Sequence, residues 1–403
     1  MKEYALSEVL VSFESGSRPK GGIKELDSGV PSLGAEHLDS TGSFNFSKLK
    51  LVPEDFHSSL KKGIVKQNDI LIVKDGATTG KVSFVNERFP FKEASINEHI
   101  FRLEINSDYA FPPYIFRFLH SPRGKQQILR DFRGATVGGI SREFADIVKV
   151  PLPSTNEQKR IAAILDKADA IRRKREKAIQ LADEFLRSVF LDMFGDPVTN
   201  PKGWPMHRLY DEINYIKNGW SPKCLDRKAV QGEWGVLKLS AVTSCQYLEN
   251  ENKALPPKAE PREDIEVSSG DLLFTRKNTY ELVGACALVE KTRSSLMLSD
   301  TIFRFHLKER SNVIPEYLWG LLTHPGKKKQ VQSLASGSAG SMPNISKERL
   351  LKLKIEVPPL NTQIKYKETL NAVKKMKERQ SKTLYIEMTM FNSLTQLAFR
   401  GEL

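Results

Sequence analysis

Residues 75–83, DGATTGKVS, come closest in this sequence to a motif with chemistry of its own, the phosphate-binding loop. That loop has the pattern G-x-x-x-x-G-K-[S/T], and its last hydroxyl binds magnesium. Here only three residues separate Gly76 from Gly80, and Val82 stands where the hydroxyl should be. The segment is therefore interpreted as a turn between two strands, not as a nucleotide site.

A second near-match is FPPY, residues 111–114. It differs from the N-P-P-Y loop with which amino-methyltransferases hold a flipped adenine. The first position of that loop needs a side-chain amide to bind the exocyclic amine of the base, and Phe111 has none. No Gly-rich cofactor-binding turn follows an early strand either. We interpret the segment as the start of a helix, where Pro is favoured.

The other reactive residues form no catalytic or metal-binding pattern. None of the seven histidines belongs to an HExxH or HxH pattern, and no carboxylate pair recurs as a hydrolytic centre would require. The three cysteines (Cys224, Cys245 and Cys286) lie far apart, which argues against both a metal site and a disulfide framework. We therefore expect this chain to bind no metal or cofactor and to act in recognition.

Charge and hydropathy indicate the kind of partner. The 403 residues include 62 Lys+Arg and 49 Asp+Glu, so the net charge is +13. This excess favours a polyanionic partner, nucleic acid before a membrane surface. No run approaches 18 apolar residues, and the N-terminal residues do not form a signal peptide. We expect a cytoplasmic protein without a membrane partner.

A long helix is predicted at residues 154–194, because no Gly or Pro interrupts it. Apolar residues recur there at alternating spacings of three and four, interrupted by Arg175. We predict a seam at Ile161, Ile164, Ala168, Ile171, Phe185 and Val189. So narrow a stripe needs a partner helix to bury it, and the segment is roughly 60 Å long.

The chain then repeats itself with a period of about 200 residues, which changes the whole interpretation. DILIV at Asp69 returns as DLLFT at Asp271, and INEHIFRLEI at Ile96 returns as LSDTIFRFHL at Leu298. A second long helix closes the second copy. Its predicted seam contains Leu370, Val373, Gln380, Leu384, Phe391 and Leu394.

These observations predict an α+β chain with two tandem mixed α/β domains, each followed by a long helix. The predicted segments are a first domain at 1–153, a central helix at 154–194, a linker at 195–207, a second domain at 208–357, and a distal helix with tail at 358–403. Antiparallel pairing of the helices would give a pseudo-twofold coiled coil. Arg175 and Gln380 would then meet near the axis; the alternative is that each extends into solvent.

Inside the first domain, apolar runs predict strands at Ile70–Val73 and Val82–Val85. A helical pattern fits Pro113 to Phe132, with Pro at its start. The Gly-rich loop GATVGGIS, residues 134–141, follows it.

The helices carry a family resemblance. The wording EQKRIAAILDKADAIRRKREKAI after Asn156, the FGDP that ends at Pro197, and the terminal AFRGEL resemble the specificity subunit of a type I restriction–modification system. The tripeptide PLP stands before the first helix and VPPL before the second. One departure is TQIKYKETL in the second helix, where the first has EQKRIAAIL. The two repeats are therefore predicted to hold their partners unequally.

The resemblance implies two target-recognition domains that bind double-stranded DNA, and no catalytic centre. It also implies two modification subunits, which methylate adenine with S-adenosylmethionine, and restriction subunits that use ATP and Mg. The cofactors are thus expected on the partner subunits. Because the two domains differ in sequence, the DNA target should be asymmetric and interrupted. Reading both halves from one face of the duplex requires half-sites about one helical turn, or a multiple, apart.

Polar and basic loops that recur in both domains are the predicted DNA-binding residues, since Arg, Lys, Asn, Ser and Thr can bind base edges or phosphates. In the first domain they are Ser17, Arg18, Lys20, Lys74, Thr78, Thr79, Lys81, Thr136 and Ser141. In the second they are Trp220, Lys223, Arg276, Lys277, Asn278, Ser338, Ser341 and Asn344. His99 could also read a base, but its counterpart Thr301 favours a structural role for it.

Two alternatives remain. The chain could be a coiled-coil scaffold whose domains bind proteins, and salt-dependent binding of duplex DNA separates that function from DNA recognition. A single-chain methyltransferase is opposed by the missing cofactor and adenine-binding motifs.

Overall fold

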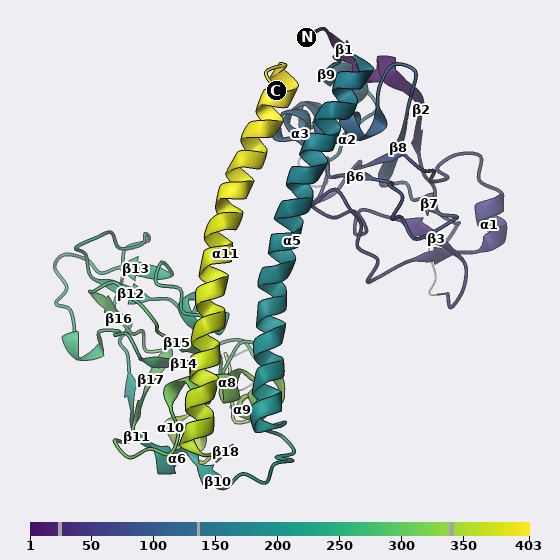
Figure 1. Cartoon of the computed structure of the whole chain (residues 1–403). Helices are drawn as coiled ribbons and strands as arrows, with labels where there is room; N and C mark the ends of the chain where they lie inside the picture. Colours follow the sequence, from purple (N-terminus) through teal and green to yellow (C-terminus); the bar gives the residue numbers. More distant parts are fainter. Residues whose placement is uncertain (23–25, 135–137, 338–341) are drawn as a thin grey trace. The chain divides into compact units, whose positions relative to one another are not determined.

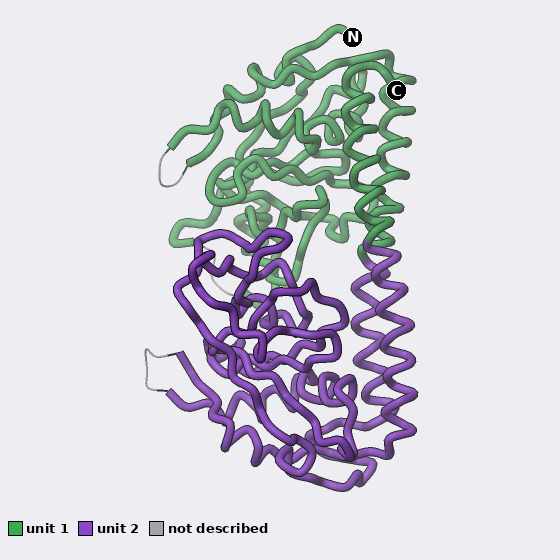
Figure 2. The backbone as a smooth tube through the Cα atoms, turned by 90° about the vertical axis from the view of Figure 1, so that its left-hand side faces the viewer, with its two compact units in different colours: residues 1–176, 382–403 green, residues 177–381 purple. Residues whose placement is uncertain are grey.

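The computed structural model describes residues 1–22, 26–134, 138–337 and 342–403. They form two compact units (Figure 2): unit 1 contains residues 1–176 and 382–403, and unit 2 contains residues 177–381. The long helices α5 (Thr155–Phe194) and α11 (Leu360–Arg400), labelled in Figure 1, each contribute residues to both units. The predicted domain boundaries, which assign each helix as a whole, stay predictions.

Unit 1 is built on a four-stranded antiparallel sheet of order β2-β8-β5-β6. A three-stranded sheet of order β4-β3-β7 and the antiparallel pair β1-β9 complete it. Its strands are β1 (Glu3–Ala5), β2 (Leu10–Ser15), β3 (Val30–Leu33), β4 (Leu51–Val52), β5 (Ile70–Val73), β6 (Val82–Phe84), β7 (Ser95–Ile96), β8 (Ile100–Ile105) and β9 (Lys149–Pro151). Its short helices are α1 (Glu54–Ser58), α2 (Pro112–His120), α3 (Pro122–Ile128) and α4 (Phe144–Ile147).

Unit 2 has the same topology strand for strand. Its sheets have the orders β11-β17-β14-β15, β13-β12-β16 and β10-β18, and a β-bulge recurs between Ile213 and Tyr215 as between Leu10 and Ser12. Its strands are β10 (Met206–Arg208), β11 (Ile213–Asn218), β12 (Gly235–Leu237), β13 (Asn252–Ala254), β14 (Leu272–Thr275), β15 (Cys286–Leu288), β16 (Leu296–Met297), β17 (Ile302–Leu307) and β18 (Lys354–Glu356). Its short helices are α6 (Leu209–Glu212), α7 (Ser240–Thr243), α8 (Pro315–Thr323), α9 (Pro325–Gln332) and α10 (Lys347–Leu351). The internal repeat is therefore present at the level of topology.

Strand β5 of unit 1 is apolar throughout because both of its faces are buried. In β5, Ile70 and Ile72 point into an inner core shared with α2, α3 and α5. Leu71 and Val73 point into an outer core beneath the three-stranded sheet. Alternation of side chains along a strand thus gives each unit two cores separated by one sheet. The strand predicted at Ile70–Val73 is confirmed, and the strand predicted at Val82–Val85 ends one residue earlier.

The helix predicted from Pro113 to Phe132 is wrong as a single element. It is divided into α2 and α3, followed by a 3-10 turn at Leu129–Asp131. Pro122 cannot supply an N–H to continue α2, and Ser121 instead caps α3 by accepting a hydrogen bond from Gly124 N. A cap followed by Pro was readable in the sequence.

A buried glutamine ties the start of each long helix to its unit in the same way. Gln158 accepts a hydrogen bond from Phe111 N at 2.8 Å and donates to Pro153 O at 3.0 Å. Gln363 accepts from Ile314 N at 2.9 Å and donates to Pro358 O at 2.7 Å. Both side chains are almost fully buried, so these hydrogen bonds are shielded from water.

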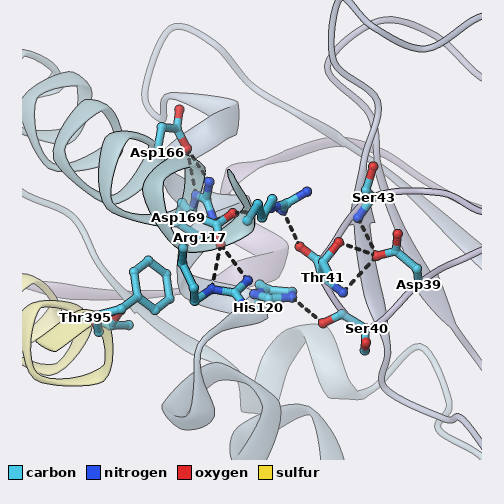
Figure 3. Close-up of polar contacts among 12 residues, drawn as sticks. Asp39, Ser40, Thr41, Ser43, Arg117, His120, Asp166, Asp169 and Thr395 are labelled. Carbon is cyan, nitrogen blue, oxygen red and sulfur yellow. Dashed lines mark hydrogen bonds and ion pairs between the residues drawn. The ribbon is translucent and has the colours of Figure 1, made fainter. Parts of the chain in front are cut away.

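Farther along α5, an ion-pair network holds the helix to unit 1 (Figure 3). The carboxylate of Asp169 forms ion pairs with Arg117 of α2 at 3.0 Å and with Arg172 and Arg173 of its own helix at 2.7 and 2.8 Å. Arg173 also donates to Thr41 O at 2.6 Å. Burial alone would raise the pKa of Asp169, but the attraction of Arg117 and the hydrogen bonds from the other two arginines lower this pKa to about 2.

At the corresponding position of α11, unit 2 uses the opposite charge. Lys374 forms an ion pair with Glu290 and lies over the ring of Trp319, 4.9 Å from its centroid. The two helices are therefore attached to their units at the same position by different chemistry.

The predicted seam of α5 is wrong at Ile171 and Phe185. Ile161 is buried, and Ala168 and Val189 are partly buried, but Ile171 and Phe185 are each 53% exposed. The residues that directly follow them are less exposed, since Arg172 is partly buried and Leu186 is buried. Ile164 is itself partly buried. At these places two neighbouring residues both fit an apolar stripe, and the sequence pattern was assigned to the wrong one.

The structure gives the burial of the predicted α11 seam residues, and their pairing with α5 stays a prediction. Leu370 and Val373 are buried in unit 2, and Leu384, Phe391 and Leu394 are partly buried in unit 1. Arg175 does not simply extend into solvent, because it forms an ion pair with Glu387 of α11 at 2.8 Å. Its proposed pairing with Gln380 stays a prediction.

The corrected seam can be tested with two adjacent residues of α5. Leu186→Ala should lower the free energy of unfolding by about 2–4 kcal/mol, since it leaves a cavity in the core of unit 2. Phe185→Ala should lower it by less than about 1 kcal/mol, since this side chain is largely exposed. Urea unfolding of both variants measures the difference, and equal losses would contradict the corrected seam.

The Asp169 network predicts a pH dependence. The pKa of the Asp169 carboxyl is about 2 in the folded protein and near the ordinary 3.8 in the unfolded chain. Ionised Asp169 therefore stabilises the fold above about pH 4. This contribution, roughly 2 kcal/mol, is lost as the pH falls from 4 towards 2. Asp169→Asn should therefore be less stable than the wild type at pH 7, with the difference shrinking below pH 4 in urea titrations. A difference independent of pH would exclude this role.

Candidate nucleic-acid interface

In unit 1, three predicted DNA-binding segments meet at the turn between β7 and β8. Loop 1 is residues 17–20, loop 2 is residues 74–81 and loop 3 is residues 136–141. Ser17 N donates to Ile96 O at 3.2 Å, and Lys74 N donates to His99 O at 2.8 Å. Ile140 N in turn donates to Lys74 O at 2.8 Å. Backbone hydrogen bonds therefore hold the three loops together around residues 96–99.

Unit 2 repeats this arrangement around residues 298–301. Its loop 1 is residues 220–223, its loop 2 is residues 276–279 and its loop 3 is residues 338–344. Trp220 N donates to Leu298 O at 2.9 Å and Arg276 N to Thr301 O at 3.0 Å. Asn278 N of loop 2 donates to Pro343 O of loop 3 at 3.3 Å, and Ile345 N, directly after loop 3, donates to Arg276 O at 2.8 Å. The same backbone contacts thus assemble both sets of loops.

A glycine before loop 1 makes the close approach possible in both units. A Cβ on Gly16 would lie 1.7 Å from Ile96 O, and one on Gly219 would lie 2.2 Å from Leu298 O. Any side chain here would push loop 1 away from the turn.

Several predicted residues are used inside the fold. Ser141 donates to Asp131 through both N and Oγ, and Lys81 donates to Leu38 O at 3.0 Å. Thr79 donates to Gly76 O, and the buried Asn278 donates to Thr243 Oγ1. These side chains shape the loops, and any contact with DNA would compete with their present hydrogen bonds.

Other predicted residues present their side chains at the surface. Lys20, Thr78, Lys223 and Lys277 are exposed, and Arg18 is more than half exposed although it pairs with Glu98. Lys74 and Ser17 are half-buried, and Asn344 accepts a hydrogen bond from Arg276 Nε at 3.1 Å. Trp220 lies beneath Arg262, whose guanidinium is 4.5 Å from the ring centroid. Thr136, Ser338 and Ser341 lie outside the described residues.

The structure adds a pair of basic residues that the sequence interpretation did not include. Arg142 follows loop 3 in unit 1 and lies over the Phe13 ring, 5.4 Å from its centroid. Lys347 holds the corresponding position in unit 2, 5.8 Å from the Phe303 centroid. The repeated motifs ISRE and ISKE could have identified this pair, since a basic residue follows Ile-Ser in both copies.

Cations gather at this place in unit 2. Burial and the positive charges of Arg276 and Lys217 lower the pKa of Lys347. Lys347 donates to Ile216 O at 2.6 Å, and Lys217 pairs with Asp264. The local excess of positive charge favours an anion such as a phosphate group.

An open hollow of about 320 Å³ lies beside loop 1 of unit 2. It is lined in part by Ser221, Pro222, Lys238, Lys253, Ser299 and Thr301. Lysine and hydroxyl groups of this kind suit a polar, negatively charged ligand.

Two further findings concern the described ranges alone. Their His, Cys, Asp and Glu side chains form no group of three or more that could hold a metal ion. None of their helices is long and apolar enough to cross a membrane.

Comparison with known proteins gives the family. A family model described as "Type I restriction modification DNA specificity domain" matches residues 1–181 and 201–387. The type I restriction enzyme EcoKI specificity subunit of Escherichia coli strain K12 is 24% identical over 402 residues, covering 94% of this chain and 83% of its own. The EcoEI specificity subunit of Escherichia coli is 37% identical over 207 residues, which are 50% of this chain and only 35% of that relative.

Solved structures share the fold. The S subunit of a type I restriction–modification system from M. genitalium superposes with a TM-score of 0.57 at 13% identity, covering 99% of this chain and 96% of that one. A chain from a structure on the assembly of a type I R-M system also gives a TM-score of 0.57, at 16% identity over all of this chain and 98% of its own. Together with the family match over both repeats, these likenesses identify the chain as a member of the type I restriction–modification DNA specificity family.

Proposed function

We propose that each unit reads one half of an interrupted, asymmetric DNA target, and that the chain carries this specificity into a type I restriction–modification complex. The observation that carries the proposal is the repeated meeting of three polar loops at one turn in each unit. Sequence-specific recognition is the property of the family, and one reading surface per repeat accounts for the duplication. Because the loops differ in sequence, the two half-sites should differ as well.

Partners are proposed to carry the chemistry. Specificity subunits are non-catalytic, so methylation and cleavage belong to modification and restriction subunits. We assign S-adenosylmethionine to the former and ATP with Mg to the latter. Two repeats of one scaffold suit two modification subunits, one for each half-site.

The long helices are proposed to pair antiparallel as a pseudo-twofold coiled coil. Contacts inside each unit support this. In unit 1 the start of α5, at Ile161 and Leu165, shares a core with the end of α11, at Ala398. In unit 2 the end of α5, at Phe190, packs on Tyr366 near the start of α11, with ring centroids 5.6 Å apart. Helix length would then set the unread spacer between the half-sites.

The alternative, a coiled-coil scaffold whose domains bind proteins, is favoured by no particular contact. Binding of duplex DNA by the full chain with its modification subunit separates the two functions. Phosphate contacts release counterions, so affinity should fall steeply with salt, by roughly 100-fold or more between 50 and 200 mM. Arg142→Ala and Lys277→Ala should each flatten this dependence by about one phosphate contact. Lys125→Ala, which changes an exposed lysine of α3, should leave it unchanged.

Binding without salt dependence, or no binding in the presence of the modification subunit, would reject DNA recognition and leave the protein scaffold.

The spacer can be tested by lengthening both helices together. Three heptads inserted after Glu176 in α5 and after Ser381 in α11 preserve the seam and add roughly 31 Å, or about nine base-pair steps. This is close to one helical turn, so both half-sites should stay on one face of the duplex. Methylation mapping should show unchanged half-sites separated by a longer spacer. A single heptad, the control, adds about three steps and should bind weakly, since the half-sites then face different sides.

Changed half-site bases, or an unchanged spacer, would refute the proposal that the units recognise the half-sites while the helices set the spacer.

A further inference from the structure

An acidic residue occupies the same position in the central turn of both units. Glu98 lies between β7 and β8, and Asp300 lies between β16 and β17, 202 residues later. Each contacts loop 1 of its own unit. Glu98 Oε1 pairs with Arg18 Nε at 2.7 Å, and Asp300 Oδ1 accepts a hydrogen bond from Ser221 Oγ at 2.5 Å.

A carboxylate is out of place on a surface that binds phosphates. Arg18 and Lys74 contact the turn in unit 1, and a negative charge beside them weakens attraction to the DNA backbone. Repetition of that charge in both units calls for a reason other than phosphate binding.

Anchoring of loop 1 does not account for the charge. The backbone hydrogen bonds Ser17 N to Ile96 O and Trp220 N to Leu298 O already hold the loop in both units. In unit 2 the partner of the acid is Ser221, a neutral hydroxyl that could also donate to an amide oxygen. The feature that both units keep is therefore the carboxylate itself.

The second carboxylate oxygen of Glu98, Oε2, is available to accept a hydrogen bond. Oε2 is covered, yet it accepts no hydrogen bond from any described residue, while the side chain as a whole is 31% exposed. Oε2 therefore has its full capacity to accept a hydrogen bond, while Oε1 is paired with Arg18 and lies 3.5 Å from His99 Nε2. Asp300 is already exposed.

Base edges offer the donors that such an acceptor needs. In the major groove the donating groups are the N4 amino group of cytosine and the N6 amino group of adenine, and Asp or Glu accepts from the former. A phosphate offers only acceptors. Resting on the proposed function of DNA reading, we infer that Glu98 and Asp300 are specificity-determining residues, each accepting a hydrogen bond from an amino-bearing base of its half-site.

The experiment uses the full chain in complex with its modification subunit. Methylation mapping first gives the wild-type target, and binding is then measured to duplexes that change each position of both half-sites singly. Glu98→Gln and Asp300→Asn keep the acceptor that binds loop 1 and remove the charge, so the fold should persist. Glu54→Gln, which changes an exposed side chain of α1, is the matched control, and thermal unfolding checks all variants.

Glu98→Gln should reduce the preference for the amino-bearing base at one or two positions of one half-site, by roughly 5- to 150-fold. Asp300→Asn should do so in the other half-site only, and Glu54→Gln in neither. Affinity that changes by one factor for all duplexes would overturn the inference, because it would mean that the acids act on phosphates or on loop 1 alone. A wild-type complex without any half-site preference would instead overturn the proposed function itself.

Discussion

The direction in which each long helix leaves its unit depends on one buried carboxamide. Gln158 and Gln363 each satisfy a backbone N–H before α2 or α8 and a carbonyl just before their own helix. Leaving such groups unsatisfied in the interior costs about 1–3 kcal/mol each, so neither helix can pivot freely at its first turn. Everything that the units do at a distance along the helices presupposes this fixed angle.

The second attachment follows a different logic. Asp169 gathers arginines in unit 1, whereas Lys374 holds Glu290 in unit 2, so the charge is reversed while the position is kept. A buried or half-buried ion pair stabilises the fold only while both partners are present, because a buried charge without its partner costs far more free energy than the pair. Position along the helix is therefore the conserved quantity between the repeats, and the chemistry at that position is free to differ.

The sequence predicted the architecture well because its strongest signals are periodic. The repeat, both long helices and the strand at Ile70–Val73 needed only spacing and alternation. The seam of α5 failed where Phe185 and Leu186 both fit an apolar stripe, although subtraction of 205 from Phe391 in the second helix identifies Leu186.

The meeting of three loops at one turn follows from their recurrence in both repeats, but the role of each side chain could not be predicted. Lys81 and Ser141 look in the sequence like other polar loop residues. Only the folded chain shows that Leu38 and Asp131 engage them. Glu98 was overlooked for the opposite reason, since a search for DNA contacts by positive charge passes over acids.

Side chains alternate along β5, so substitutions on its two faces should affect different parts of the unit. Ile70 and Ile72 share their core with α5, so substitutions at these two residues should alter how α5 packs on the unit. Leu71 and Val73 share theirs with Ile96 and Ile100, which flank the turn that carries Glu98. Substitutions on this outer side can reshape the loops while the helix side stays untouched. One strand therefore joins the core of the long helix through one face and the core beneath the loop-bearing turn through the other.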